Sequence, residues 1–248
     1  MALKDDFYQV FVDMNDPTKL AIYAPVENPD PSANPHDEGW YDSDGAEDIT
    51  EDTTVQAGKT YYTKATVDGD TYLATKVGDI IKQFVADCTL TVQPSTITGS
   101  DASPSGTFSG SASVEWEITG TTITDTILEV ETPSMTDDDF AQAFGDALDA
   151  DAPTWTASLS GTTTVPGGGS SPSVDKATIS ATYVSASVVL ALKTAFATMK
   201  TMTAAGQDGN QVFATALATA VTTYYTSAVV QGKGATHLSD CQFQVVIS

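Results

Sequence analysis

The stretch TTVQAGKTYYT, which begins at Thr53, contains Gly58, Lys59 and Thr60 in the order that phosphate-binding loops use. Such a loop also needs a glycine five residues before Gly58, because backbone amides must wrap around the phosphates without an intervening Cβ. Thr53 stands at that position, and the residues after Thr60, YYTKATV, are typical of a strand and not of the helix that faces a bound phosphate. We therefore interpret Ala57-Gly58 as a turn before a strand and predict no nucleotide site.

Among residues for acid-base or metal chemistry, carboxylates are abundant and histidines are few. The two histidines, His36 and His237, would need carboxylates from elsewhere to bind a metal, and no Gly-x-Ser-x-Gly elbow accompanies them. Glu115 and Glu117 flank Trp116 in SVEWEIT and share one face if this segment is a strand. Such a pair suits a glycosidase, or the solvated face of a strand whose tryptophan points inward. We favour surface histidines and a solvated face, and predict no catalytic residue, no cofactor and no metal.

An acidic run, DGAEDITED, spans residues 44–52 and raises the question of a calcium site. The EF-hand loop needs glycine at its sixth position and glutamate at its twelfth. Counted from Asp42, Gly45 falls at the fourth position and Thr53 at the twelfth. The pattern favours a solvated acidic loop, and a cation site is the alternative.

Two cysteines, Cys88 and Cys241, open the alternating segments CTLTV and CQFQV. Neighbouring strands would bring them near each other, but sequence alone does not place two Cα atoms within bridging distance. No other cysteines indicate a disulfide framework. We expect two buried free thiols, with a single disulfide as the alternative.

The charge balance excludes several classes of partner. The chain has 33 acidic and 10 basic residues, all of them lysine, and a formal net charge of -23. Nucleic acids and anionic membranes both require cationic surfaces, so neither is an expected partner. The amino terminus, MALKDDFYQV, lacks the basic start and apolar core of a secretion signal, which predicts synthesis in the cytoplasm.

The first 39 residues combine a helical pattern with a proline-rich segment. Apolar residues recur at helical spacing in residues 3–14, and residues 24–39 carry four prolines that favour an extended path. We expect residues 1–39 to form a helix and an arm that dock on a neighbouring subunit. We expect no small-molecule substrate for this chain. The expected assembly contacts are Phe7, Val10, Phe11 and Met14.

Residues 40–77 are expected to form a small β-hairpin module. The Asp68-Gly69 pair lies between YYTKATV and DTYLATKV and predicts a hairpin turn. Aromatic residues are frequent here, and those expected at the surface are Trp40, Tyr41, Tyr61 and Tyr62.

Residues 78–248 are expected to form the main domain, and the whole chain is predicted to be α+β and β-rich. Six segments have strand composition: CTLTVQ, GTFSGSASVEWEIT, TTITDTILEVE, WTASLSGTTTV, KATISATYVS and CQFQVVIS. Turn residues between them favour antiparallel pairing. About three helices interrupt these strands, in TDDDFAQAFGDALDA, ASVVLALKTAFATMKTMTA and NQVFATALATAVTTYY, the first capped by Thr136.

Two of these helical segments continue in a similar way. FAQAFGDALDADAPTWTASLSG begins at Phe140 and FATALATAVTTYYTSAVVQG begins at Phe213. Both run from an apolar helix face through an aromatic residue into a strand and a glycine. A duplicated helix-strand unit would explain the match, and shared amphipathicity is the alternative.

The segment TEDTTVQAGKTYYTK resembles a β module of virion structural proteins of tailed bacteriophages, in which Thr-Thr-Val and Gly-Lys-Thr-Tyr-Tyr recur. The Thr, Ser, Ala and Gly-rich remainder, acidic and without arginine, is also similar to capsid, neck or tail components. The resemblance implies a non-enzymatic subunit of the virion that contacts copies of itself and other virion proteins. A bacterial surface or carbohydrate-binding β module is the alternative, because of the aromatic residues expected at the surface.

Overall fold

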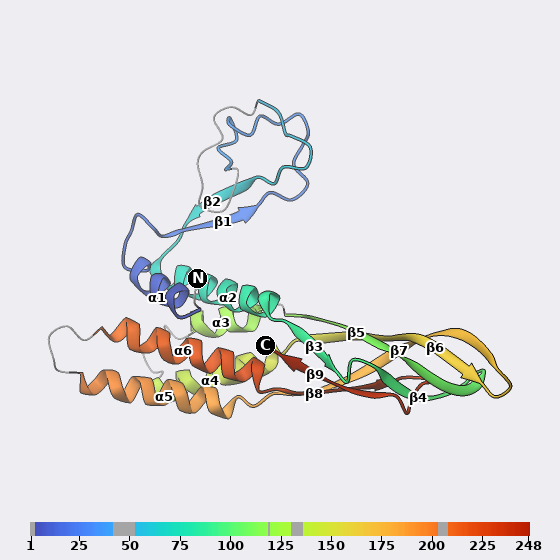
Figure 1. The fold of residues 1–248 in the computed structure, drawn as a ribbon. Coiled ribbons are helices and arrows are strands. Elements are labelled where there is room, and N and C mark those ends of the chain that lie inside the picture. The colour runs from blue at the N-terminus through green and yellow to red at the C-terminus, as the bar shows by residue number, and fades with distance from the viewer. Residues whose placement is uncertain (1–2, 42–52, 119, 130–135, 203–207) are drawn as a thin grey trace.

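The computed structural model describes residues 3–41, 53–118, 120–129, 136–202 and 208–248. These residues form a mixed α+β fold with a large antiparallel sheet and a small two-stranded sheet. Figure 1 shows the helices gathered at one end of the large sheet, which extends away from them as a long curled sheet. The small sheet stands to one side of the helices.

The described part contains six helices, more than the sequence predicted. Four of them match expected helical segments, at the amino terminus and in the main domain. The other two lie in segments that were expected to be strands. The helices are α1 (Leu3–Asp13), α2 (Gly69–Asp87), α3 (Thr121–Glu129), α4 (Asp137–Ala150), α5 (Ala186–Thr201) and α6 (Gly209–Thr226).

The strands divide between the two sheets. In the small sheet, β1 (Ala21–Pro25) pairs antiparallel with β2 (Tyr62–Thr66). The large sheet has the order β3-β9-β8-β7-β6-β5-β4, and its neighbouring strands pair antiparallel. Its strands are β3 (Leu90–Gln93), β4 (Ile97–Ala102), β5 (Ser105–Glu117), β6 (Thr154–Val165), β7 (Gly169–Thr182), β8 (Val229–Gly234) and β9 (Gln242–Ile247).

The start of α4 follows its sequence signal closely. Thr136 accepts a hydrogen bond from the Asp139 amide, and the Asp139 carboxylate accepts one from the Thr136 amide in return, which is a capping box. Asp137 and Asp138 complete a first turn of carboxylates that complement the helix dipole. Local chemistry therefore determines where this helix begins.

The Asp68-Gly69 pair begins a helix, so the predicted hairpin is wrong. The Asp68 carboxylate accepts a hydrogen bond of 2.8 Å from the Thr71 amide and caps α2. Aspartate suits a helix cap as well as a hairpin turn, and burial of Tyr72 and Ile81 decides for the helix. The strand YYTKATV therefore pairs with β1 from the expected arm segment, and not with the residues that follow it.

The segment TTITDTILEVE was also expected to be a strand, and its first nine residues form α3. Ile123 and Ile127 are four residues apart and both are buried among the helices. The β-branched residues give a strand signal, but propensity is weak beside the burial of a complete apolar helix face.

Helix α1 packs into the core of its own chain. Phe7 is fully buried and Val10 and Phe11 are 6% exposed, in a cluster with residues of α2 and α6. The rings of Phe11 and Phe213 lie 5.3 Å apart, and the partly buried Met14 packs against the same cluster. This burial corrects the expectation that these four residues contact a neighbouring subunit, because the chain itself covers their apolar face.

Two pairs of neighbouring strands are each connected through two helices. β5 leads through α3 and α4 to β6, and β7 leads through α5 and α6 to β8. The two similar segments in the sequence form the second helix and the following strand of these two units. Common origin of the units remains a prediction, but their similar placement is a feature of the fold.

The helices and the large sheet have separate cores that meet at an aromatic junction. Trp116, at the end of β5, packs against both cores. Its ring centroid lies 5.1 Å from that of Trp155 and 5.9 Å from that of Tyr225. The Trp155 Nε1–H donates to the Tyr183 hydroxyl at 3.1 Å. Burial raises the pKa of Tyr183 to about 12, so this hydroxyl stays neutral at physiological pH.

Phe7→Ala should lower the free energy of unfolding by about 3–5 kcal/mol, because it leaves a cavity between α1, α2 and α6. The matched control is Val12→Ala on the same helix, whose side chain is 41% exposed and whose loss should change stability by about 0.5 kcal/mol or less. Urea denaturation measures both. A Phe7→Ala variant as stable as the original chain would contradict this assignment of α1 to the core.

Candidate functional site

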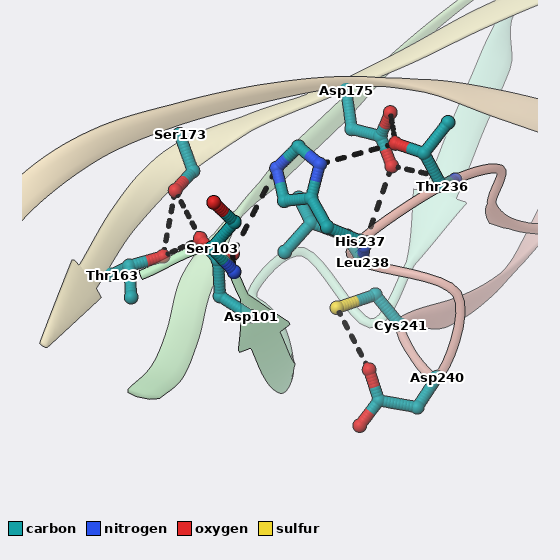
Figure 2. A network of polar contacts seen from close by, with 10 residues as sticks. All are labelled: Asp101, Ser103, Thr163, Ser173, Asp175, Thr236, His237, Leu238, Asp240 and Cys241. Atoms are coloured by element: carbon teal, nitrogen blue, oxygen red, sulfur yellow. Dashed lines mark hydrogen bonds and ion pairs between the residues drawn. The ribbon is translucent and has the colours of Figure 1, made fainter. Parts of the chain in front are cut away.

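The loop between β8 and β9, residues 235–241, places His237 beside Asp101 of β4 (Figure 2). The Asp240 carboxylate accepts hydrogen bonds from the Ser100 amide at 2.8 Å and from the Ser100 hydroxyl at 2.7 Å. The Ala102 amide donates to the His237 carbonyl at 3.4 Å. The edge strand β4 is thus tied to a loop from the opposite end of the strand order.

Asp101 is the centre of this closure. Its carboxylate is 2% exposed and accepts hydrogen bonds from the Ser173 hydroxyl at 2.5 Å, from the Thr163 hydroxyl and from the Ser103 amide at 2.9 Å. The hydrogen bonds from Ser173 and Thr163 lower the pKa of Asp101 to about 2. His237 places Nε2 at 3.9 Å from the carboxylate. Asp101 therefore joins β4 to β6 and β7 as an anion.

A second buried carboxylate, Asp175 on β7, holds the same loop. It accepts hydrogen bonds from the Thr236 hydroxyl at 2.5 Å, the Thr236 amide at 3.1 Å and the Leu238 amide at 3.4 Å. Burial alone would raise the pKa of Asp175, but the hydrogen bonds from Thr236 and Leu238 outweigh it and lower the pKa. Asp175 thus fixes the path of the loop from the inner side of the sheet, while Asp101 joins β4 to β6 and β7.

Thr236, His237 and Asp101 follow one another in the order hydroxyl, imidazole and carboxylate that nucleophilic catalysis uses. The Thr236 hydroxyl lies 3.1 Å from His237 Nδ1, but it also donates to Asp175. The separation of 3.9 Å between His237 Nε2 and Asp101 is too long for a hydrogen bond. The geometry therefore supports the position of the loop and does not activate a nucleophile.

Sequence reasoning missed this network. His237 was expected to be an ordinary surface residue, but its side chain is only partly exposed and lies within the closure, whereas His36 is exposed as expected. Asp101 and Asp175 occupy positions at which the strand alternation points inward, and an inward carboxylate is the signal that would have identified them.

No cluster of three or more His, Cys, Asp or Glu residues with metal-binding geometry occurs within the described ranges. The acidic run of residues 44–52 lies outside the described residues. Glu115 and Glu117 are exposed on β5 while Trp116 between them points toward the cores, which confirms the interpretation as a solvated strand face.

Both thiols are free. Cys241 is buried, and Cys88 is only partly buried at the end of α2. Burial raises the pKa of Cys241 to about 11 and also raises the pKa of Cys88. Both thiols are therefore protonated and weakly nucleophilic at neutral pH.

The aromatic residues of the small unit were expected to be exposed, and the structure corrects this. Tyr61 is fully buried, and Trp40, Tyr41 and Tyr62 are partly buried. The ring centroids of Trp40 and Tyr61 lie 5.7 Å apart. These residues form the small core around which residues 26–41 fold, because a two-stranded sheet needs additional apolar cover.

The Gly58-Lys59 pair lies in a turn, as the sequence indicated. Gly58 has φ of +80°, which favours glycine, and the Lys59 amide donates to the Gln56 carbonyl at 3.2 Å. The Lys59 ammonium lies 5.6 Å from the centre of the Tyr61 ring. The lysine thus stabilises the small unit through its own aromatic residue, and β2 follows where a phosphate loop would need a helix.

An apolar cavity of about 690 Å³ lies among the helices. Phe11, Phe140, Phe196 and Phe213 contribute to its wall, and Asp137 at its rim pairs with Lys200 at 2.6 Å. The wall is mainly apolar, and its polar residues are Asp70, Thr136 and Asp137. Thr136 caps α4 and Asp137 pairs with Lys200, so both already have partners within the chain.

Comparisons with protein-family models, with curated proteins and with solved structures each gave no match. In the described part of the chain, no helix combines the length and apolar character that a membrane span requires.

The Asp101 closure predicts a specific pH dependence. Asp101→Asn should be less stable than the original chain at pH 7, and this difference in thermal unfolding should shrink as the pH falls from about 4 to about 2. The sign follows from the pKa of Asp101, which is lowered from its usual 3.8 to about 2 by folding, so its contribution is present above pH 4 and lost through pH 2.

Thr163→Val removes one donor to Asp101 and should cost about 1.5–3 kcal/mol at pH 7. Thr164→Val is the matched control, because Thr164 is the next residue along β6 and is exposed. Equal stability of Thr163→Val and Thr164→Val would contradict the closure. The closure would also be contradicted if the stability difference between Asp101→Asn and the original chain did not change with pH.

The free thiols predict slow labelling in the folded state. At pH 7.5, maleimide should modify Cys241 much more slowly than in denaturant, because burial hides the thiol and raises its pKa. After denaturation without reductant, both Cys88 and Cys241 should react. Mass spectrometry counts the added groups, and a requirement for reductant would reveal a disulfide.

Proposed function

We propose that this chain is a non-enzymatic structural subunit of a bacteriophage virion, as a head decoration, neck or tail component. It acts through contacts with copies of itself and with other virion proteins. The observation that carries the proposal is the folded state of the segment that resembles virion proteins. Residues 53–64 belong to a small β unit that stands to one side of the helices (Figure 1). Such a unit adds a contact surface to the helices and the large sheet, which have cores of their own.

In the described residues, the small unit meets the helices at Leu20 and Val67, where β1 begins and β2 ends. The Val67 amide donates to the Leu20 carbonyl at 3.1 Å where the two connecting strands leave the helices, and β1 and β2 pair over five residues from there. Its own aromatic residues stabilise its far end. The unit is therefore a folded projection from the helices, which suits recognition of a neighbouring subunit.

The polar network of the large sheet supports a structural function in a second way. Its carboxylates accept hydrogen bonds from the chain itself, and these bonds close the sheet. Such a network stabilises a shape and leaves little capacity for a substrate.

A carbohydrate-binding module of a bacterial surface is the second candidate. Tyr23 and Tyr41 meet edge to face with ring centroids 5.3 Å apart, and the Lys64 ammonium lies 5.8 Å from the centre of the Tyr41 ring. Both rings are partly exposed, so their remaining faces offer stacking surface to a sugar.

The virion proposal predicts that the chain is present in purified particles at many copies each. Quantitative mass spectrometry of density-purified particles should recover its peptides in a constant ratio to the major capsid protein. The matched control is the same density fraction from uninfected cells. Absence from particles would contradict the proposal, and binding of the full chain to glycans with loss on Tyr41→Ala would favour the second candidate.

A further inference from the structure

The outward face of the large sheet is almost free of charge. Its outward positions in β5 to β9 carry mainly Ser, Thr and Gln, as the regular alternation of exposed and buried residues shows. Among the outward positions of these described strands, the carboxylates are Glu115 and Glu117, both at the end of β5 nearest the helices, and the lysines are Lys176 and Lys233.

This neutrality is unusual in a chain of 33 acidic residues and net charge -23. The carboxylates instead concentrate in the helices, for example in the first turn of α4. At such a net charge two copies repel each other, and the repulsion is smallest where carboxylates are absent. The outward positions of β7, β8 and β9 carry Lys176 and Lys233 but no carboxylate, so this part of the sheet is where a second copy can approach most easily.

The outward side chains form rows across neighbouring strands. Gln93 on β3 pairs with Gln244 on β9, Gln244 pairs with Gln231 on β8, and Gln231 pairs with Ser180 on β7. Directly opposed residues on one sheet face lie about 5 Å apart. Beside this row, Val229 is 59% exposed and Val246 is 42% exposed. A polar row with apolar neighbours has the mixed composition of a protein interface.

The chemistry of this face is complementary to itself. Each Gln, Ser or Thr side chain both donates and accepts hydrogen bonds, so a patch of them can pair with an identical patch. A two-fold symmetric contact requires such self-complementarity, because the same surface is present on both partners. Carboxylates only accept when ionised, so an acidic face would leave both partners without donors.

The face is large enough for a small interface. Alternate residues on strands about 4.8 Å apart each cover roughly 33 Å² of a sheet, so the outward positions of β3, β9, β8 and β7 together cover roughly 500 Å². Two such faces bury roughly 1,000 Å² in total, which is the lower limit for a specific protein interface. A hollow of about 890 Å³ lies beside Pro94, Gln231 and Gln244, so this part of the face is concave.

From these observations we infer that the outward face of β3, β9, β8 and β7 binds the same face of a second copy of this chain. The inference rests on the proposed structural function and names the contact through which copies associate. It replaces α1, whose apolar face is buried in its own chain, as the surface for self-association.

Replacing neutral residues of this face by charged residues in the full chain tests the inference. The double variants Gln231→Glu with Gln244→Glu, and Gln231→Lys with Gln244→Lys, place like charges on both partners. Each alone should associate at least tenfold more weakly than the original chain in sedimentation velocity at 0.15 M salt. An equimolar mixture of the two should recover association, because opposite charges then face each other.

The matched control is Asn210→Asp with Gln211→Glu, which adds the same two negative charges at exposed positions in the first turn of α6, where carboxylates favour the helix. It should associate as the original chain does, and thermal unfolding should show that all variants are folded.

A monomeric original chain at all concentrations, undiminished association of both double variants, or a mixture that stays monomeric would each overturn the inference. A glycan that binds this face in place of a second copy would overturn it as well. These outcomes are independent of the particle measurement. Peptides in purified particles together with a monomeric chain would refute the face and keep the virion function, and the reverse result would refute the virion function alone.

Discussion

The closure of the curled sheet by buried carboxylates is the interaction on which the rest of the structure depends. An open sheet has two edges with unpaired backbone groups, and exposed edges invite uncontrolled pairing with other chains. Here Asp240, in the loop after β8, accepts hydrogen bonds from Ser100 on β4, and Asp175 holds the same loop from the inner side. Asp101 joins β4 to β6 and β7. Because this loop engages the β4 edge, the sheet can extend away from the helices and present its outward face.

The aromatic junction packs the large sheet against the helices. Tyr183 stacks on Tyr224 with ring centroids 5.1 Å apart, and the Tyr224 hydroxyl donates to the Leu148 carbonyl at 2.9 Å. Trp116 packs against both cores at the same place. Each unit of two helices thus starts and ends at strands whose spacing is already fixed. A polar closure at the far end and an aromatic junction at the near end together stabilise one elongated body.

This arrangement separates charge from contact surface. The helices carry the carboxylates that keep a chain of net charge -23 soluble, whereas the sheet carries neutral hydrogen-bonding side chains. The small β unit adds a projection whose aromatic residues stabilise it internally. The proposed function as a subunit of an assembly would require these properties in different places, because solubility before assembly and contact after assembly make opposite demands on one surface.

The sequence by itself determined features that depend on neighbouring residues: the cap of α4 at Thr136, the turn at Gly58 and the long alternating strands. It also set the neutrality of the sheet face, since alternation assigns each side chain to a face. Tertiary structure decided what local patterns leave open. Asp68 fits a hairpin or a helix cap, the apolar face of α1 fits either partner, and Asp101 meets Ser173 only after distant strands pair. Burial settles such choices, because its free energy depends on which segments the fold brings together.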